Sequence, residues 1–325
     1  MVISSRMRIL LSTCSYQDTP GPHHELMNAQ NWEVVRCRGP LSEAQMLEYA
    51  GDFDAFLCGD DAISEAVLKK SLPRLKVISK YGIGLDKIDI PATKALKIPV
   101  LFTPGVNHHT VAEHTFLLLL AMMKNFAFAI DSTRAGRWDR KTGNELHSKR
   151  IGLIGMGRIG QEVARRAQAF GMEIHGYGNF WPNKVAREIG IIRHQSHESL
   201  FESVDIISPH TNLNGNSYQL INRERLKRMP IGSWIVNTGR GELVDQVAIL
   251  EALDSGQLAG YGADVLNEEP PALDHPLLHH PKVIITPHVG SRTFESVPRQ
   301  AMKSLTNLIH ALEGGDHCNC ANGVL

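Results

Sequence analysis

A glycine-rich motif near the middle of the chain has the residue types needed to hold the pyrophosphate of a dinucleotide. It reads Gly155-Met156-Gly157-Arg158-Ile159-Gly160, which matches GxGxxG. An apolar run at 150–154 precedes it and a helical pattern at 161–170 follows, so the glycines fall at a strand-to-helix turn. There Gly155 permits the tight turn, Gly157 lets the backbone approach the pyrophosphate, and Gly160 lets the helix lie close to the strand. The N–H groups at the helix start would face the anion. An ordinary turn with fortuitous glycines is the alternative.

The next predicted strand, 173–178, ends without the acidic residue that normally binds the adenine ribose. Asp or Glu is expected about 20 residues after the first glycine, but Gly178 and Asn179 stand there. An acid would repel the extra phosphate of NADP, so its absence leaves NADP possible, and Asn179 could still hydrogen-bond a ribose. Lys184 and Arg187 follow as a potential source of positive charge, or as solvated helix residues. The sequence favours NAD slightly and leaves NADP open.

Three further segments place polar residues directly after predicted strands, where open parallel sheets bind their ligands. The segments are 237–241, 264–270 and 286–290, and they contain Arg240, Glu269 and His288. A surface arginine, a solvated loop acid and a structural histidine are the plain interpretations, since the chain has 16 histidines. Residue type alone therefore singles out none of these three.

With these segments the chain resembles the D-isomer-specific 2-hydroxyacid dehydrogenase family, and its D-3-phosphoglycerate dehydrogenase-like members most of all. The resemblance covers almost the whole length. Several ordered motifs in one chain are more specific than GxGxxG alone. Besides the glycine motif and the three segments, they are Lys80-Tyr81-Gly82-Ile83-Gly84-Leu85-Asp86, Thr103-Pro104-Gly105-Val106-Asn107 and Val111-Ala112-Glu113-His114-Thr115.

The resemblance implies an oxidoreductase that transfers a hydride between a nicotinamide cofactor, NAD, and a small 2-hydroxy or 2-keto acid. It implies that Arg240 binds substrate, and a guanidinium suits this because it holds a carboxylate in a planar fork. It implies His288 as general acid/base, paired with Glu269, because imidazole exchanges a proton near neutral pH. Glu268 is then a solvated loop acid.

The resemblance also implies the residues that line the two ligands. The loop Gly82, Ile83 and Gly84 would supply backbone N–H groups to the substrate carboxylate, unless it is only a tight turn. Asp264 would lie near the nicotinamide carboxamide, with a strand-end cap as its alternative, and His210 would line the adenine side. The expected cofactor-binding residues are Gly155, Met156, Gly157, Arg158, Ile159, Gly160, Asn179, His210, Thr238, Asp264 and Gly290. No metal is expected.

The substrate is expected to carry no phosphate. Recognition of a phosphate needs positive charge, but Asp60 and Asp61 follow the third predicted strand, and the loop 15–24 has no Lys or Arg. Capping of a predicted helix at 63–72 is the alternative role of the two acids. Three other functions stay open: a true 3-phosphoglycerate dehydrogenase of serine synthesis, a formate- or phosphite-oxidising branch, and a non-catalytic cofactor-sensing module.

Short apolar runs alternate with helical stretches along the chain, which predicts strand–helix–strand units and parallel sheets. The pattern starts near residue 8 and restarts at 149, and a last helical stretch at 293–312 could return to the first domain. We expect an α/β protein of two doubly wound parallel-sheet domains, a Rossmann-type cofactor domain inserted in a flavodoxin-like substrate domain. The expected substrate domain is 1–104 with 292–325, and the expected dinucleotide-binding domain is 105–291.

Composition limits the partners. The 325 residues carry 34 Lys and Arg against 34 Asp and Glu, so neither a nucleic-acid surface nor polybasic membrane attachment is expected. Five scattered cysteines without a CxxC pair fit a reducing, cytoplasmic location, and Cys318 and Cys320 are expected in a frayed tail. The apolar stretch 115–130 is too short and interrupted to span a bilayer, and it predicts a homodimer contact.

Overall fold

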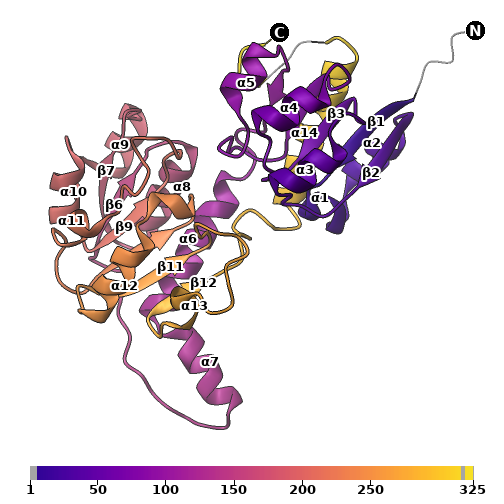
Figure 1. Cartoon of the computed structure of the whole chain (residues 1–325). Coiled ribbons are helices and arrows are strands. Elements are labelled where there is room, and N and C mark those ends of the chain that lie inside the picture. The colour runs from indigo at the N-terminus through magenta and orange to yellow at the C-terminus, as the bar shows by residue number, and fades with distance from the viewer. Residues whose placement is uncertain (1–5, 316–318, 325) are drawn as a thin grey trace, which may run out of the picture. The chain divides into compact units, whose positions relative to one another are not determined.

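The computed structural model describes residues 6–315 and 319–324. The chain divides into two compact units (Figure 1): unit 1 is Met1–Asn107 with Arg292–Leu325, and unit 2 is His108–Ser291. The chain passes from unit 1 to unit 2 after Asn107 and back to unit 1 after Ser291.

Unit 1 contains a five-stranded parallel sheet. Its strands lie in the order β2-β1-β3-β4-β5, which is the flavodoxin-like arrangement. The strands are β1 (Met7–Leu11), β2 (Trp32–Arg36), β3 (Ala55–Cys58), β4 (Val77–Lys80) and β5 (Val100–Leu101).

Helices cover both faces of this sheet because successive strand residues point to opposite sides. Leu10 and Phe56 pack with α3 (Glu43–Tyr49), α4 (Glu65–Ser71) and α5 (Ile90–Ala95). Their neighbours Ile9 and Leu57 pack with the helices of the other face, which are α1 (Cys14–Asp18), α2 (Pro22–Asn28) and α14 (Ser296–Leu312). The yellow α14 in Figure 1 therefore brings the C-terminal part of the chain back to unit 1, as the sequence suggested.

The C-terminal tail corrects one expectation. Residues 319–324 are tied to unit 1 and do not fray: Cys320 forms an antiparallel bridge with Leu101, and the Ala321 N–H donates to Val100 O at 2.7 Å. The Asn322 amide donates to Ile98 O at 2.7 Å. Backbone hydrogen bonds at the edge strand hold this segment, and Cys318 lies outside the described residues.

Unit 2 contains a seven-stranded parallel sheet in the order β12-β11-β10-β9-β6-β7-β8. Counted from β6, this is the Rossmann order with one added strand. The expected fold class is confirmed. The strands are β6 (Arg150–Ile154), β7 (Glu173–Tyr177), β8 (Ile192–Arg193), β9 (Ile206–Pro209), β10 (Ser233–Asn237), β11 (Leu258–Ala263) and β12 (Val283–Ile285).

Both faces of this sheet are also covered. Ile206 and Val236 pack toward α6 (His108–Met123), α8 (Arg158–Ala169) and α9 (Asn183–Ile189). Ile207 and Ile235 pack on the other side, toward α10 (His197–Ser203), α11 (Arg223–Leu226), α12 (Gln246–Asp254) and α13 (Pro276–His279). All the strands are parallel, so their carboxyl ends, and the turns that follow them, share one edge.

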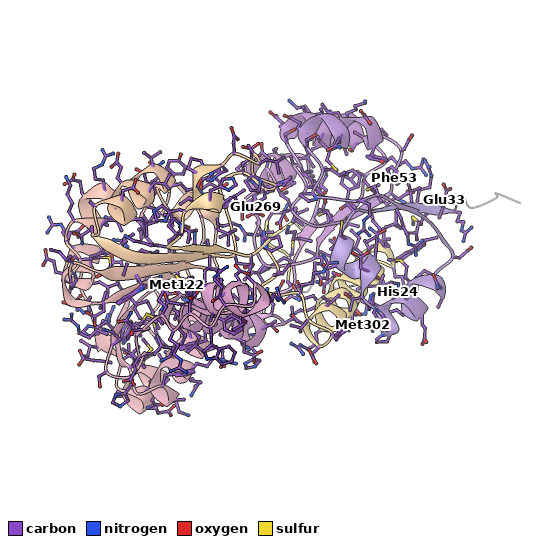
Figure 2. All side chains as sticks on the ribbon, turned by 90° about the horizontal axis from the view of Figure 1, so that it is seen from below. His24, Glu33, Phe53, Met122, Glu269 and Met302 are labelled. Atoms are coloured by element: carbon purple, nitrogen blue, oxygen red, sulfur yellow. The ribbon has the colours of Figure 1, made fainter. Side chains whose placement is uncertain are left out.

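The apolar stretch at 115–130 forms most of α6 and the start of α7 (Phe126–Arg134), which are bent by 64° at their junction. Met122 of α6, labelled in Figure 2, lies against β11, where a Cβ on Gly262 would come within 2.9 Å of its Cε. In the described part of the chain no single helix has the length and apolarity to cross a membrane, and α6 with α7 meets that test only as a bent pair.

The predicted strand 173–178 extends one residue beyond the carboxyl end of β7, and the apolar run 150–154 coincides with β6. At the carboxyl ends of β6 and β10 the chain leaves the sheet for the turns that carry the glycine motif and Arg240. β8 was not predicted, since two residues show no periodicity.

Candidate active site

The buried carboxylate of Asp264, directly after β11, organises the segment that carries His288. Its side chain is 3% exposed. Oδ1 accepts hydrogen bonds from the Thr286 hydroxyl at 2.6 Å and the Val289 N–H at 2.9 Å, and Oδ2 accepts from the Gly290 N–H at 2.7 Å. A Cβ on Gly290 would lie 2.7 Å from Oδ2, so glycine is required there. This observation favours the strand-end anchor as the structural role of Asp264.

His114 of α6 completes this anchor. Its Nε2 lies 2.7 Å from the Thr286 hydroxyl and 3.2 Å from Asp264 Oδ1. Burial alone would raise the pKa of Asp264, but the hydrogen bonds from His114, Thr286 and the Val289 N–H outweigh it and hold that pKa below its usual range. Asp264 is therefore a charged, fully bonded support for the 286–290 segment.

His288 and Glu269 form a direct pair. His288 Nδ1 lies 2.7 Å from Glu269 Oε2, and both side chains are 34% exposed. Oε1 of the same carboxylate accepts the Leu266 N–H at 3.0 Å, which fixes its orientation. An ionised carboxylate only accepts, so Nδ1 carries a proton and Nε2 is directed away from the pair. His288 has a φ of 51°, and its N–H donates to Asp264 O at 2.8 Å. The Asp264 segment thus imposes a backbone conformation that is uncommon outside glycine.

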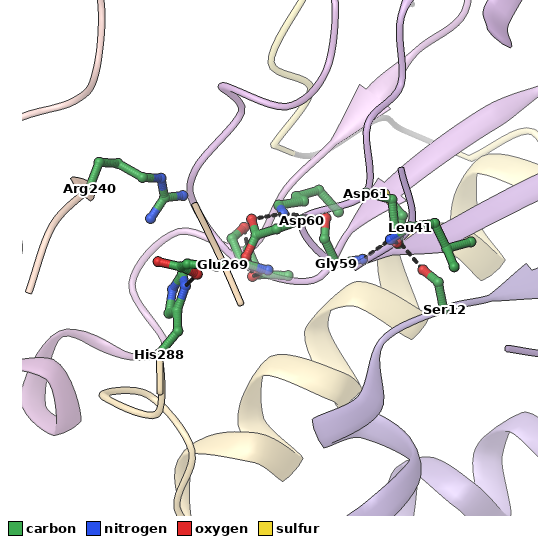
Figure 3. A network of polar contacts seen from close by, with 12 residues as sticks. Ser12, Leu41, Gly59, Asp60, Asp61, Arg240, Glu269 and His288 are labelled. Atoms are coloured by element: carbon green, nitrogen blue, oxygen red, sulfur yellow. Dashed lines mark hydrogen bonds and ion pairs between the residues drawn. The ribbon is translucent and has the colours of Figure 1, made fainter. Parts of the chain in front are cut away.

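Arg240 lies in a tight turn after β10. Asn237 stabilises this turn, because its amide donates to Arg240 O at 2.7 Å and accepts the Gly239 N–H at 3.0 Å. Next to it, a Cβ on Gly241 would lie 2.0 Å from Leu266 C, so this turn packs against the turn that Glu269 caps. Figure 3 shows Arg240, Glu269 and His288 with their polar ends in one region of unit 2. The structure therefore gathers these three predicted residues.

The glycine motif has the geometry that a pyrophosphate needs. Gly155 has a φ of +99°, and a Cβ on it would lie 2.5 Å from His210 O. A Cβ on Gly160 would lie 2.1 Å from Gly155 O, so the start of α8 is pressed against the turn. A Cβ on Gly157 would meet nothing within 4 Å, so its backbone faces open space. The chain thus fits a dinucleotide at this turn.

The other expected cofactor residues differ in burial and in the partners that they already have. His210 follows β9 and backs Gly155, and burial lowers its pKa to about 4, so its imidazole is neutral at physiological pH. Asn179 is exposed after β7, and Met156 is buried. The Thr238 hydroxyl lies 2.9 Å from that of Thr115 on α6, which gives it a structural partner.

In unit 1, Thr103 holds the glycine loop that follows β4. Gly82, at a φ of +127°, donates its N–H to Thr103 Oγ1 at 2.9 Å and accepts the Thr103 N–H at 3.0 Å. The Gly82 N–H is thus already bonded. The Ile83 and Gly84 N–H groups have no acceptor in the described part of the chain, so the loop offers two donors and not three.

Asp60 and Asp61 have separate partners in unit 1 (Figure 3). Asp61 is fully buried and accepts hydrogen bonds from the Ser12 hydroxyl, the Leu41 N–H at 2.7 Å and the Gly59 N–H at 3.0 Å. Asp60 lies 2.6 Å from the ammonium group of Lys80, whose side chain is 2% exposed. Asp61 therefore joins three segments inside unit 1 by hydrogen bonds, and it does not repel a phosphate at the surface.

The capping role of these two acids is wrong. The helix predicted from residue 63 begins at Glu65, and Ser64 caps it by accepting the Val67 N–H at 3.4 Å.

Sequence reasoning missed the supporting residues. Asn237, His114, Thr286 and Thr103 each lie inside a segment that we singled out, but their partners are 2 to 172 residues away. Membership of the same motifs was the only available signal. Among residues 6–315 and 319–324, no group of three or more His, Cys, Asp or Glu is placed to hold a metal ion.

Dinucleotide-dependent oxidoreductases share this arrangement, in which the turn for the pyrophosphate and the groups for proton exchange follow strands of one parallel sheet. Residues 116–290 match the family model described as D-isomer specific 2-hydroxyacid dehydrogenase, NAD binding domain. The chain belongs to the D-isomer specific 2-hydroxyacid dehydrogenase family. It is an NAD-dependent oxidoreductase that acts on CH–OH groups by hydride transfer.

Individual relatives cover most of the chain. It is 38% identical to the glyoxylate reductase of Thermofilum pendens over 281 residues, which are 85% of this chain and 83% of that protein. It is 37% identical to the D-3-phosphoglycerate dehydrogenase of Bacillus subtilis over 75% of this chain, but spans only 46% of that protein. The crystal structure of D-lactate dehydrogenase from Aquifex aeolicus with NAD and lactic acid superposes with a TM-score of 0.86 at 26% identity, covering 97% of this chain and 99% of that one.

The Asp264 anchor makes stability depend on pH in a defined direction. Both carboxylate oxygens of Asp264 accept hydrogen bonds, whereas the NH₂ group of an asparagine can only donate. In Asp264→Asn at least one of these donors would therefore lose its acceptor, and we expect the free energy of unfolding at pH 7 to fall by about 1–3 kcal/mol. Because the folded pKa of Asp264 is lowered, its contribution is complete above the unfolded pKa of about 3.9 and is lost as pH falls through the folded value. Urea denaturation from pH 7 to 3 should show the difference between wild type and variant shrinking in acid. Asp274→Asn, at an exposed position, is the matched control, and a difference that stays constant down to pH 3 would contradict the assignment.

Proposed function

We propose that this enzyme reduces a small, unphosphorylated 2-keto acid, with unit 2 as the dinucleotide-binding domain and unit 1 as the substrate domain. The observation that carries the chemistry is the 2.7 Å pair of His288 and Glu269 beside Arg240. The glyoxylate reductase of Thermofilum pendens supports the choice of substrate class.

His288 is the proposed general acid/base. Glu269 holds the proton on Nδ1, so Nε2 is the atom that exchanges a proton with the substrate. A nearby carboxylate also stabilises the imidazolium that reduction requires. In the reduction, C2 of the keto acid gains the hydride and Nε2 delivers a proton to the carbonyl oxygen. Oxidation of the hydroxy acid reverses both transfers.

The proposed substrate groups are cationic or N–H donors. Arg240 would hold the substrate carboxylate and polarise the carbonyl, since a guanidinium presents two parallel donors. The Ile83 and Gly84 N–H groups would supply further donors to the carboxylate. Both elements suit a compact 2-keto acid with one carboxylate.

The proposed cofactor residues are those of the glycine motif, with His210 behind it and the 286–290 segment beyond. Bound NADH supplies the hydride. The N–H groups at the start of α8 and the open face of Gly157 would hold the pyrophosphate. The neutral His210 adds no charge to the adenine side.

The surroundings of Lys80 disfavour a phosphorylated substrate. It ends β4, directly before the glycine loop, and a Cβ on Gly82 would lie 3.8 Å from its Cε. Its ammonium contacts Gly59 O and lies 2.6 Å from the Asp60 carboxylate. Asp60 thus offsets the buried positive charge that lies closest to this loop, and a substrate phosphate would meet a compensated pair.

Removal of the acid/base should slow turnover strongly without unfolding the protein. We expect His288→Gln to lower kcat by about 10²- to 10⁴-fold, since glutamine can still bond Glu269 but cannot transfer a proton. Glu269→Gln should lower kcat less and change the pH profile. His279→Gln and Glu268→Gln are matched controls at exposed positions. NADH oxidation at 340 nm measures the rates, and full turnover by His288→Gln would refute the assignment.

A substrate panel tests the charge argument. We expect glyoxylate and hydroxypyruvate to be reduced with a higher kcat/KM than 3-phosphohydroxypyruvate. Asp60→Asn should raise kcat/KM for the phosphorylated acid about fivefold, because it frees the charge of Lys80. Asp52→Asn, on the surface of unit 1, is the control. If the wild type reduces only 3-phosphohydroxypyruvate, the protein is a phosphoglycerate dehydrogenase and our interpretation of Asp60 fails.

We propose a cytoplasmic location and a homodimer. The location is supported by the cysteines that the structure describes, since Cys14, Cys37, Cys58 and Cys320 are free thiols and disulfides are rare in the cytosol. The dimer contact is assigned to the region of α6 and α7, where apolar side chains remain exposed in the single chain. They are Leu117 (52%), Phe126 (54%), Phe128 (40%) and Trp138 (77%).

Light scattering tests the dimer directly. At micromolar concentration we expect a mass of twice 36.0 kDa. Phe126→Glu should shift the mass toward one chain, because it buries an unpaired charge in an apolar contact. Ile231→Glu, at an 87% exposed position elsewhere in unit 2, should leave the dimer intact. A monomeric wild type would contradict the proposal.

A further inference from the structure

The end of β7 lies against the glycine motif and lacks a carboxylate. The Gly155 N–H donates to Tyr177 O at 2.8 Å, which places the residue after β7 beside the first glycine. A Cβ on that residue, Gly178, would lie 3.4 Å from Met156 N and 3.5 Å from Gly155 Cα. In dinucleotide folds this is the position of the acid that bonds the ribose 2′-hydroxyl and repels a 2′-phosphate.

No acid replaces it from the neighbouring turns. The segments that follow β6, β7, β8 and β9 are 155–157, 178–182, 194–196 and 210–216, and none contains Asp or Glu. The acid on α8 is Glu162, whose Oε2 accepts a hydrogen bond from the Arg166 guanidinium at 2.8 Å and lies 3.0 Å from His109 Nδ1. The first turn of α8 holds no acidic residue. A 2′-phosphate at this edge would therefore meet no uncompensated negative charge from these elements.

A cation is available instead. Arg158 begins α8, two residues after Met156, and it is exposed. In the described part of the chain its guanidinium has no hydrogen bond or ion pair. A guanidinium can bind phosphate oxygens through two parallel hydrogen bonds. Lys184, in contrast, lies 3.9 Å from Glu188, so it is the weaker candidate.

We infer that this enzyme binds NADPH as well as NADH, because Gly178 removes the discriminating carboxylate and Arg158 supplies a partner for the 2′-phosphate. This inference rests on the proposed placement of the dinucleotide at the glycine motif. It concerns the adenosine end of the cofactor and is independent of the keto acid that is reduced.

Binding of the two reduced cofactors to the full chain tests it without any turnover. Fluorescence titration should give wild-type Kd values for NADH and NADPH within about tenfold of each other. Gly178→Asp should weaken NADPH at least tenfold and change NADH less than threefold. Gly178→Asn, which has the same size without the charge, should keep the wild-type ratio. Arg158→Gln should weaken NADPH more than NADH.

The variants are compatible with the fold. Gly178 is not among the residues with positive φ, and its added Cβ would meet no atom closer than 3.4 Å. A wild type that binds NADH more than tenfold tighter than NADPH would overturn the inference, and so would equal effects of the Asp and Asn variants. If both cofactors bind as expected but no 2-keto acid is reduced, the inference stands and the proposed function fails.

Discussion

The site depends on one buried negative charge, the carboxylate of Asp264. A charge removed from water is costly unless hydrogen bonds and charge partners replace the lost hydration. Here the replacement comes from the Thr286 hydroxyl, two N–H groups of the following residues and His114. Satisfying the carboxylate therefore fixes the backbone of residues 286–290. The position and the unusual φ of His288 follow from this constraint.

The parallel sheet of unit 2 brings the turns that are held in this way to the same edge. Every strand of unit 2 runs in one direction, so the turns after β6, β9, β10, β11 and β12 share an edge. Each turn has its own internal support: Gly155 and Gly160 at the first, Asn237 at the Arg240 turn and Asp264 at the last. The proposed reacting groups thus lie in turns whose conformation is fixed by neighbours that have no proposed part in the reaction.

The selectivity that we propose for this enzyme depends on local charge compensation. The overall balance is zero and carries no information about a small ligand. Asp60 compensates Lys80 beside the proposed substrate loop, and Gly178 stands where dinucleotide folds usually carry an acid. In our proposal the Asp60–Lys80 pair disfavours a phosphate on the substrate, and the absence of an acid at Gly178 permits a phosphate on the cofactor.

The sequence by itself determined the parts that depend on neighbours along the chain. The glycine motif, the segments around Arg240, Glu269 and His288, and the alternation that predicts two parallel sheets could all be identified, because strand periodicity and turn chemistry are local. It did not determine that Asp61 forms hydrogen bonds inside unit 1 or that Asp60 pairs with Lys80. Nor did it determine that residues 319–324 bind the edge strand, or that His114 contacts Asp264, which is 150 residues away in the sequence. Only the tertiary structure decided these, because hydrogen bonds between distant residues depend on the register of the sheets and on which helix covers which face.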